Sequence, residues 1–377
     1  MLKAARCRPS HDVVAAVKIV QKKGQYALAV VSLALGLFST AAQAADQSSV
    51  ALYGRIAGGF DYITNVKDSS GNSTSVRRYS NSQWGTSLWG INGKEDLGGG
   101  LYAVLKLESA FETGSGQLGG PMWGRYSIVG VSSNQYGTIW FGRALALPDG
   151  EVYTIDPMGL QATGAPTLHG NRSWGPRNNT VTYNSPQLGP VTFRLQAAPN
   201  EVGMSPGRLF AGVVTYQDSE LMLKALYEEI RDRNGNFSNL YSTSRLMTVG
   251  ATYKTGDLKL FLARSQIRSD KAVVADEENP FAATRQDTTW FGVNYQATPA
   301  LTLIGGAYHA VTDVDGNRGT LFALGANYSL SKRTMLFATT GHVRNGANGI
   351  FPVEANGGRP PVGTNQRNVY AGMIYWF

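Results

Sequence analysis

The sequence contains very little cysteine, and after its first 44 residues it contains no long apolar run. The single cysteine among 377 residues is Cys7, so no disulfide can form within one chain. No stretch of 18 apolar residues follows residue 44, which excludes a transmembrane helix from that part of the chain. A membrane protein without such helices must satisfy its backbone hydrogen bonds between strands that close into a barrel.

Charged residues are also scarce, at 16% of the chain against roughly 25% in an average soluble domain. Much of the formal net charge of +8 lies in the first 44 residues, which hold six Lys or Arg and one Asp. The other 333 residues carry 28 basic and 25 acidic side chains, a net charge of +3. This balance does not indicate a nucleic-acid partner.

The N-terminal region has the three parts of a secretory signal. Lys18, Lys22 and Lys23 precede an apolar run at residues 26–38, and Ala42-Gln43-Ala44 forms a small-x-small cleavage site. We therefore predict a signal peptide at residues 1–44 and a mature domain at 45–377. Residues 1–16 exceed what such a signal needs and are consistent with a mis-assigned start.

Alternation with a period of two residues, broken by Gly, Asn, Asp and Pro, dominates residues 45–377 and predicts β-strands. All fourteen prolines of this region fall between the predicted strands, because proline cannot donate a ladder hydrogen bond. Sixteen strands are predicted, at residues 50–63, 84–93, 101–111, 124–133, 137–144, 179–185, 191–198, 210–217, 220–230, 245–254, 257–268, 287–296, 300–311, 319–328, 333–343 and 367–377.

The connections between these strands alternate between short turns and mostly longer loops, as an outer-membrane barrel requires. An even number of strands places both termini on the periplasmic side. The longest connection spans residues 145–178 and has 34 residues. A loop of that length within a compact fold is usually functional or disordered.

The alternation also predicts which face of the wall meets lipid. In residues 101–111, Leu101, Leu105 and Leu107 share one face, whereas Lys106 and Glu108 share the other. Segments 191–198, 220–230 and 245–254 show the same opposition. The signal peptide and the size of the barrel favour an apolar exterior and a polar lumen, as in a 16-stranded channel.

Four segments resemble the general porins of Gram-negative bacteria. They are SVALYGRI at 49–56, GKEDLGGGL at 93–101, RNNTVTY at 177–183 and the terminal Phe377. One departure is Gln83, at a position where many relatives carry arginine before Trp84.

The resemblance implies an all-β, 16-stranded antiparallel transmembrane β-barrel over residues 45–377, with a constriction loop folded into the lumen. It also implies a homotrimer in the cell outer membrane. Each protomer would contact outer-membrane lipid and lipopolysaccharide, and would present Phe377 to the barrel-insertion machinery.

By its place after the fifth strand, the 145–178 connection resembles the loop that narrows a porin lumen. The implied function is a passive diffusion channel for small hydrophilic solutes and ions. Opposed charges at such a constriction set ion preference, and five wall bases against three loop acids suggest a weak preference for anions. The loop acids are Asp149, Glu151 and Asp156, and the basic wall is Arg55, Lys106, Arg125, Arg194 and Lys224.

Two other functions fit parts of the sequence. A substrate-specific porin for a small organic anion or sugar could use Tyr153, His169 and Trp174, which lie in the long loop. An outer-membrane hydrolase would need a nucleophile with a positioned base. The mature region has three histidines without metal-ligand spacing and no Gly-x-Ser-x-Gly motif. We therefore expect no catalysis, no metal and no other cofactor.

Overall fold

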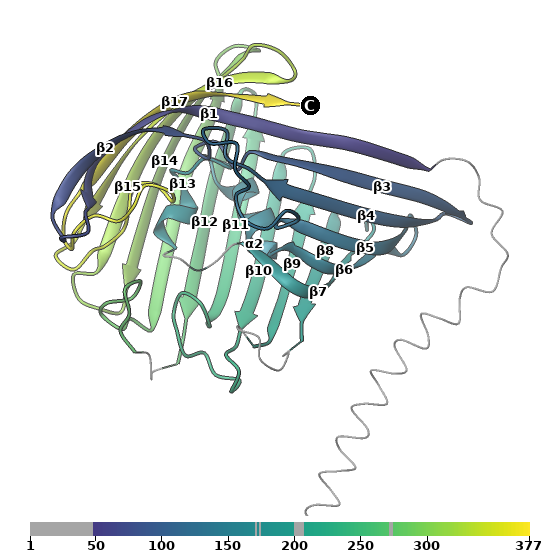
Figure 1. Ribbon diagram of the computed structural model, residues 1–377, viewed down its shortest axis with the longest axis horizontal. Helices are drawn as coiled ribbons and strands as arrows, with labels where there is room; N and C mark the ends of the chain where they lie inside the picture. Colours follow the sequence, from purple (N-terminus) through teal and green to yellow (C-terminus); the bar gives the residue numbers. More distant parts are fainter. Residues whose placement is uncertain (1–47, 170–171, 173–174, 200–206, 271–273) are drawn as a thin grey trace, which may run out of the picture. The chain divides into compact units, whose positions relative to one another are not determined.

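The computed structural model describes residues 48–169, 172, 175–199, 207–270 and 274–377, so the predicted signal peptide lies outside the described residues. Most of the regular structure in these residues belongs to one antiparallel sheet (Figure 1). No helix in the described part is long and apolar enough to cross a membrane. The strands are β1 (Ser49–Lys67), β2 (Ser73–Ser80), β3 (Leu88–Gly98), β4 (Leu101–Ala110), β5 (Tyr126–Ser133), β6 (Gly137–Leu145), β7 (Pro176–Asn184), β8 (Val191–Ala198), β9 (Leu209–Gln217), β10 (Leu221–Ile230), β11 (Arg245–Thr255), β12 (Leu258–Arg268), β13 (Arg285–Gln296), β14 (Leu301–Thr312), β15 (Arg318–Ser329), β16 (Thr334–Asn345) and β17 (Gln366–Trp376).

The sheet closes on itself because its first and last strands pair. The register of β1 with β17 runs from Arg55 opposite Trp376 to Ile63 opposite Asn368. Figure 1 shows these two strands side by side, and the other strands follow in sequence order. Closure pairs the first and last strands of the sheet, so no open edge is left between them. The predicted antiparallel barrel is therefore confirmed.

The barrel has sixteen strand positions because β2 and β3 together occupy one of them. The first part of β1, residues 49–55, pairs with β3, and the part from residue 59 to 67 pairs with β2. The predicted strand at 84–93 is thus displaced to 88–98, and residues 73–80, which were expected in a loop, form a strand. Between them, residues 81–87 leave the wall and bury Gln83 and Ser87. The Ser87 hydroxyl accepts a hydrogen bond of 2.9 Å from the Ala57 amide, which holds the segment in place.

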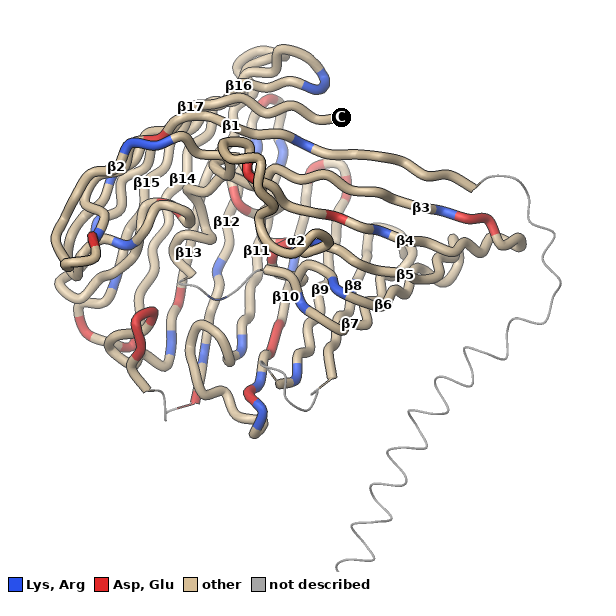
Figure 2. Tube along the Cα trace, in the orientation of Figure 1, with Lys and Arg blue, Asp and Glu red and all other residues tan. Residues whose placement is uncertain are grey.

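The exterior of the barrel is apolar and its inner face is polar. Leu105, Val129 and Phe291 are exposed to 41%, 62% and 55%, whereas Thr248 and Gln196 are 2% and 1% exposed. Figure 2 shows that charged residues are sparse along most strands. The distribution is the inverse of a soluble barrel and confirms the predicted lipid face.

The turn between β3 and β4 depends on glycine. Gly98, Gly99 and Gly100 have φ values of 82°, 60° and 77°, all in the left-handed region. Three successive residues with a Cβ would be strained there. These glycines belong to the segment at 93–101 that resembles general porins.

Candidate functional site

The long connection between β6 and β7 lies against the inner face of the barrel. Within it are α2 (Leu147–Glu151) and the 3-10 helices η1 (Val152–Ile155) and η2 (Ala165–Leu168). Val152, Ile155 and Leu168 are buried in one cluster with Trp290 and Tyr308 of the wall. Burial of these apolar side chains stabilises the inward position of the loop. The predicted constriction loop is therefore folded into the lumen.

Polar contacts fix the turn after η1. The Tyr308 hydroxyl donates to Asp156 Oδ1 over 2.6 Å, and the amides of Met158 and Ala165 donate to the same carboxylate over 2.9 and 2.7 Å. Burial raises the pKa of Asp156 to about 6. Asp156 is 2% exposed, and its three hydrogen bonds stabilise the shape of the loop.

The loop continues across the lumen to the last strands. The Tyr370 hydroxyl donates to Gln161 Oε1 over 3.0 Å, and Asn368 Nδ2 donates to Thr163 Oγ1 over 2.8 Å. At the other end, Trp290 Nε1 donates to the Ile155 carbonyl over 2.9 Å. These contacts to distant parts of the wall fix the position of the loop within the lumen.

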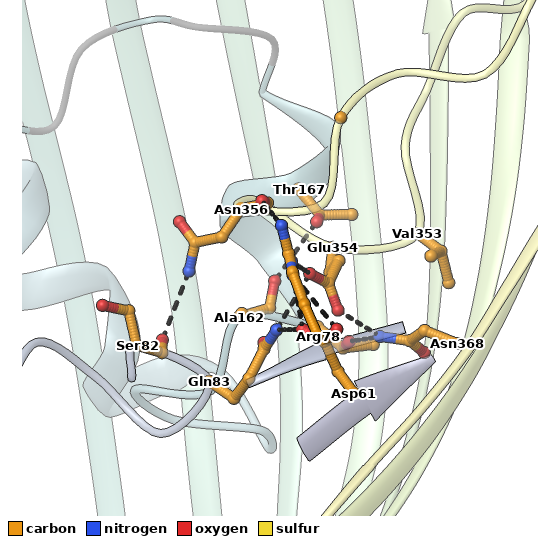
Figure 3. A network of polar contacts seen from close by, with 12 residues as sticks. Asp61, Arg78, Ser82, Gln83, Ala162, Thr167, Val353, Glu354, Asn356 and Asn368 are labelled. Carbon is orange, nitrogen blue, oxygen red and sulfur yellow. Dashed lines mark hydrogen bonds and ion pairs between the residues drawn. The ribbon is translucent and has the colours of Figure 1, made fainter. Parts of the chain in front are cut away.

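The inward segment 81–87 is held by a network that Figure 3 shows. Arg78 Nη2 donates to Glu354 over 2.7 Å, and its Nε donates to Asp61 over 3.0 Å. Gln83 Nε2 donates to the same two carboxylates, over 2.5 Å to Asp61 and 2.9 Å to Glu354. The Gln83 carbonyl accepts from the Ala162 amide over 2.9 Å. Gln83, the departure noted in the sequence, therefore connects the wall to the constriction loop.

Glu151 is an ion-paired residue of the loop. Arg194 Nη1 donates to Glu151 Oε1 over 2.5 Å, and Lys224 Nζ donates to Glu151 Oε2. Lys224 Nζ also donates to Thr154 Oγ1 over 2.8 Å. The predicted wall bases Arg194 and Lys224 thus compensate a loop carboxylate that is 9% exposed.

Two cavities lie against the loop and share part of their lining. One has a volume of about 400 Å³ and the other about 370 Å³. Both are lined by Arg55 and Arg125 of the wall and by Asp149, Tyr153 and Leu160 of the loop. The larger cavity is also lined by Lys106 and Arg194.

An acidic residue that was not among the predicted site residues lies within the basic wall. Glu108 is 3% exposed and accepts from Arg125 Nε over 2.7 Å and from the Tyr53 hydroxyl over 2.7 Å. Lys106 Nζ lies 3.4 Å from Glu108 Oε2 and 3.9 Å from the centre of the Tyr126 ring. The sequence could have identified Glu108 as a site residue, because it lies on the same strand face as Lys106.

The charges of Arg55 and Asp149, which line the cavities, are less neutralised by neighbouring groups than those of the other site residues. Arg55 Nε donates to the Thr86 carbonyl over 2.7 Å, and no carboxylate among the described residues forms an ion pair with it. Asp149 makes no hydrogen bond or ion pair within the described part of the chain. Burial raises the pKa of Asp149 to about 6, and the nearby Arg125 opposes this rise.

The remaining loop residues have different surroundings. His169 is 1% exposed, its Nδ1 lies 2.6 Å from the Ala165 carbonyl, and burial lowers its pKa to about 4. Trp174 lies outside the described residues. No group of three or more metal-ligating side chains occurs in the part of the chain that the structure describes.

A closed barrel with a polar lumen and an internal loop defines a transmembrane channel. The sequence profile of the family described as Gram-negative porin matches residues 27–348. An outer membrane porin protein of Bordetella pertussis is 27% identical over 357 residues, which cover 82% of this chain and 91% of that protein. Outer membrane porin protein 32 of Delftia acidovorans is 26% identical over 372 residues, which cover 92% of this chain and 99% of that protein.

Solved structures share the fold. The anion-selective porin from Comamonas acidovorans has a TM-score of 0.72 at 22% identity, covering 88% of this chain and all of that one. The trimer form of OmpT from Vibrio cholerae has a TM-score of 0.63 at 17% identity, with coverage of 88% and 100%. The chain belongs to the Gram-negative porin family. It is a multi-pass β-barrel of the outer membrane and forms a passive channel.

Proposed function

We propose that this porin passes small hydrophilic solutes and ions with a weak preference for anions. The observation that carries the proposal is the lining of the larger cavity, which has four basic side chains and two acidic ones. The bases are Arg55, Lys106, Arg125 and Arg194, and the acids are Glu108 and Asp149. Similarity to a porin described as anion-selective supports the same sign.

The charges at this constriction bias passage without retaining solutes. Two unit charges about 7 Å apart at an effective dielectric near 20 interact by roughly 2 kcal/mol. This energy alters conductance and selectivity but does not make a high-affinity site. Much of the basic charge is also compensated, because Glu108 pairs with Arg125 and Glu151 pairs with Arg194.

The test is the reversal potential of single channels in planar bilayers under a gradient of KCl. We expect chloride to be favoured in the wild type, and we expect Arg55→Gln and Arg125→Gln each to reduce that preference. Arg333→Gln is the matched control, because Arg333 lies in an exposed short turn. A cation-selective wild type, or equal effects in all three variants, would contradict the proposal.

The family resemblance supports three further proposals about assembly. The signal peptide at residues 1–44 is removed during export, the mature chain forms a homotrimer, and Phe377 is presented to the insertion machinery. A trimer form is described for one protein with this fold. The terminal residue lies at the β1–β17 closure, where its amide donates to the Gly54 carbonyl over 3.1 Å.

We also propose that lipopolysaccharide phosphates bind a belt of outward-facing arginines near the long loops. Three of them are aligned across strands, with Arg245 opposite Arg268 and Arg268 opposite Arg285. Guanidinium groups bind phosphate in a bidentate manner, and like charges in register are otherwise unfavourable. The belt is Arg245, Arg264, Arg268, Arg285, Arg318, Arg344 and Arg367.

Only part of this belt is paired within the protein. Asp270 pairs with Arg245, and Asp287 pairs with Arg264 and Arg285. The other four arginines form no ion pair with the described carboxylates. We expect a variant with these four changed to glutamine to retain less lipopolysaccharide during purification, whereas Arg333→Gln should retain as much as the wild type. Equal retention in the two variants would contradict this partner.

A further inference from the structure

A third cavity lies between the constriction loop and the short turns of β11–β15. Its volume is about 750 Å³. Its loop side is formed by residues 153–154 and 156–159, and its turn side includes Gly256 and Asp257 between β11 and β12. It contains none of Arg55, Lys106, Arg125 or Arg194, and it shares only Tyr153 and Gly159 of the loop with the two cavities of the constriction.

Two lysines of this cavity occupy directly opposed positions. Lys254 of β11 and Lys259 of β12 are cross-strand partners in the ladder. Both face the lumen, because they follow the parity of the buried residues Thr252 and Phe261. Side chains at opposed positions have Cβ atoms about 4.5–5.5 Å apart, and like charges there are destabilising. The pair therefore carries an energetic cost within the barrel.

Nothing in the described part of the wall forms an ion pair with either ammonium group. Asp257, in the turn between the two strands, is the nearest acid along the chain, and it too lines the cavity without pairing with them. Asp156 also lines the cavity, but its carboxylate accepts from Tyr308 and two backbone amides. The two positive charges are thus available to a ligand from the lumen.

The other walls of the cavity have an apolar component. Met222, Phe261 and Ile304 project from the barrel, and Pro157 and Met158 project from the loop. Lys259 Nζ lies 5.0 Å from the centre of the Phe261 ring. A volume of this size is typical of sites for small organic ligands, and the lining combines these apolar side chains with polar and charged groups.

We infer that Lys254 and Lys259 form a binding site for small aromatic dicarboxylates in the vestibule on the short-turn side of the constriction. One ammonium group would engage each carboxylate, and the ring would lie against the apolar walls. The inference rests on the channel function and goes beyond it, because it adds retention of one solute class to passive diffusion. It does not depend on the sign of the ion preference at the constriction.

Phthalate block of single-channel current tests this site. The variants are Lys254→Gln, Lys259→Gln and the double variant, with a folded barrel verified by its heat-modifiable mobility on gels. Lys94→Gln is the matched control, since Lys94 is an exposed lysine near another short turn whose cross-strand partner is Val104. Benzoate and uncharged benzamide serve as comparison solutes.

We expect phthalate to interrupt the wild-type current more strongly than benzoate, and benzamide to have no effect. An exposed ion pair contributes about 0.2–1 kcal/mol, so each single variant should raise the half-blocking concentration by about threefold and the double variant by about tenfold. Lys94→Gln should leave this concentration unchanged. No block of the wild type, or block that survives in the double variant, would overturn the inference.

The constriction variant Arg125→Gln separates this site from the proposed ion preference. It should shift the reversal potential and leave the half-blocking concentration of phthalate close to the wild-type value. Block that is lost in Arg125→Gln and retained in the lysine variants would place the ligand at the constriction and overturn the vestibule site. A failure of the ion-preference proposal would instead appear in the reversal potential alone.

Discussion

Replacement of Asp149 by asparagine should increase the preference of the channel for anions. Asp149 lies in α2 and lines both cavities of the constriction together with Arg55 and Arg125. Its carboxylate makes no hydrogen bond to the described residues, so an asparagine can replace it without releasing the loop. The substitution removes one negative charge beside the ion path and changes little else.

The expected size of the effect follows from Coulomb's law. In the water of the lumen, where the dielectric is about 80 rather than the value near 20 used above for charges at the wall, a unit charge about 7 Å from an ion interacts with it by roughly 0.6 kcal/mol. Screening at about 0.1 M salt reduces this to roughly 0.3 kcal/mol. Because an anion gains this energy and a cation loses it, the permeability ratio should change by about threefold.

The pH provides an independent way to remove the same charge. Burial raises the pKa of Asp149 to about 6, so the carboxylate binds a proton as the pH falls from 7.5 to 5. The negative charge is lost below the pKa, and the anion preference of the wild type should therefore rise by a similar factor on acidification. In Asp149→Asn, the rise in anion preference that protonation of Asp149 causes should be absent.

Reversal potentials measured at pH 7.5 and pH 5 under a tenfold KCl gradient would check both statements. Asp315→Asn is a matched control, because Asp315 lies in an exposed loop between β14 and β15. The pKa of Asp156 is also raised, but Asp156 is present both in the wild type and in Asp149→Asn. Its contribution to the pH dependence therefore cancels when these two proteins are compared. The reasoning would be refuted if Asp149→Asn kept the wild-type permeability ratio, or if it kept the full pH dependence.

Three other perturbations have defined outcomes. Tyr308→Phe removes the hydroxyl that donates to the buried loop carboxylate and should lower the free energy of unfolding by about 1.5–3 kcal/mol in guanidinium titrations, whereas Tyr295→Phe on the lipid face should change it little. Glu151→Gln leaves Arg194 and Lys224 without their carboxylate and should raise the anion permeability ratio by about threefold in the reversal-potential assay. An unchanged ratio would argue against a role for these two cations in the ion path. Arg78→Met leaves the buried carboxylates of Asp61 and Glu354 without their cation and should lower the thermal midpoint. The midpoint should fall less at pH 5 than at pH 7.5, because burial raises the pKa of Glu354. A fall that is independent of pH would contradict this explanation.

The local pattern of the sequence predicted the strands, and together with the signal peptide and the size of the barrel it predicted which face meets lipid. Alternation has a period of two in any strand, so residues such as Leu105 and Lys106 already show that the two faces differ. The prolines and the glycines at 98–100 lie between strands or at their ends, as Pro176 does at the start of β7, because their backbone requirements are local. The length of the 145–178 loop marked it as a functional or disordered segment, and its place after the fifth strand, by resemblance to general porins, predicted that it enters the lumen.

The break between β2 and β3 could not be derived in this way. Residues 73–80 have no apolar alternation, and they form a strand only because the end of β1 is available to pair with them. Gln83 turns inward because it binds Asp61 and Glu354, and Glu354 is 271 residues distant in sequence. A pattern that is read locally contains no information about such a partner.

The tertiary structure alone decided how the predicted charges are distributed. Arg55, Arg125 and Asp149 line two cavities against the loop, whereas Glu151 is held by Lys224 across a separation of 73 residues. Asp156 has the same chemistry as Asp149, but it is buried against Tyr308 of a distant strand. The sequence by itself determined which side chains are charged and which wall face carries them. Only the packing of the loop against the wall decided which charges are neutralised and which face the solute, because that outcome depends on contacts between segments far apart in the chain.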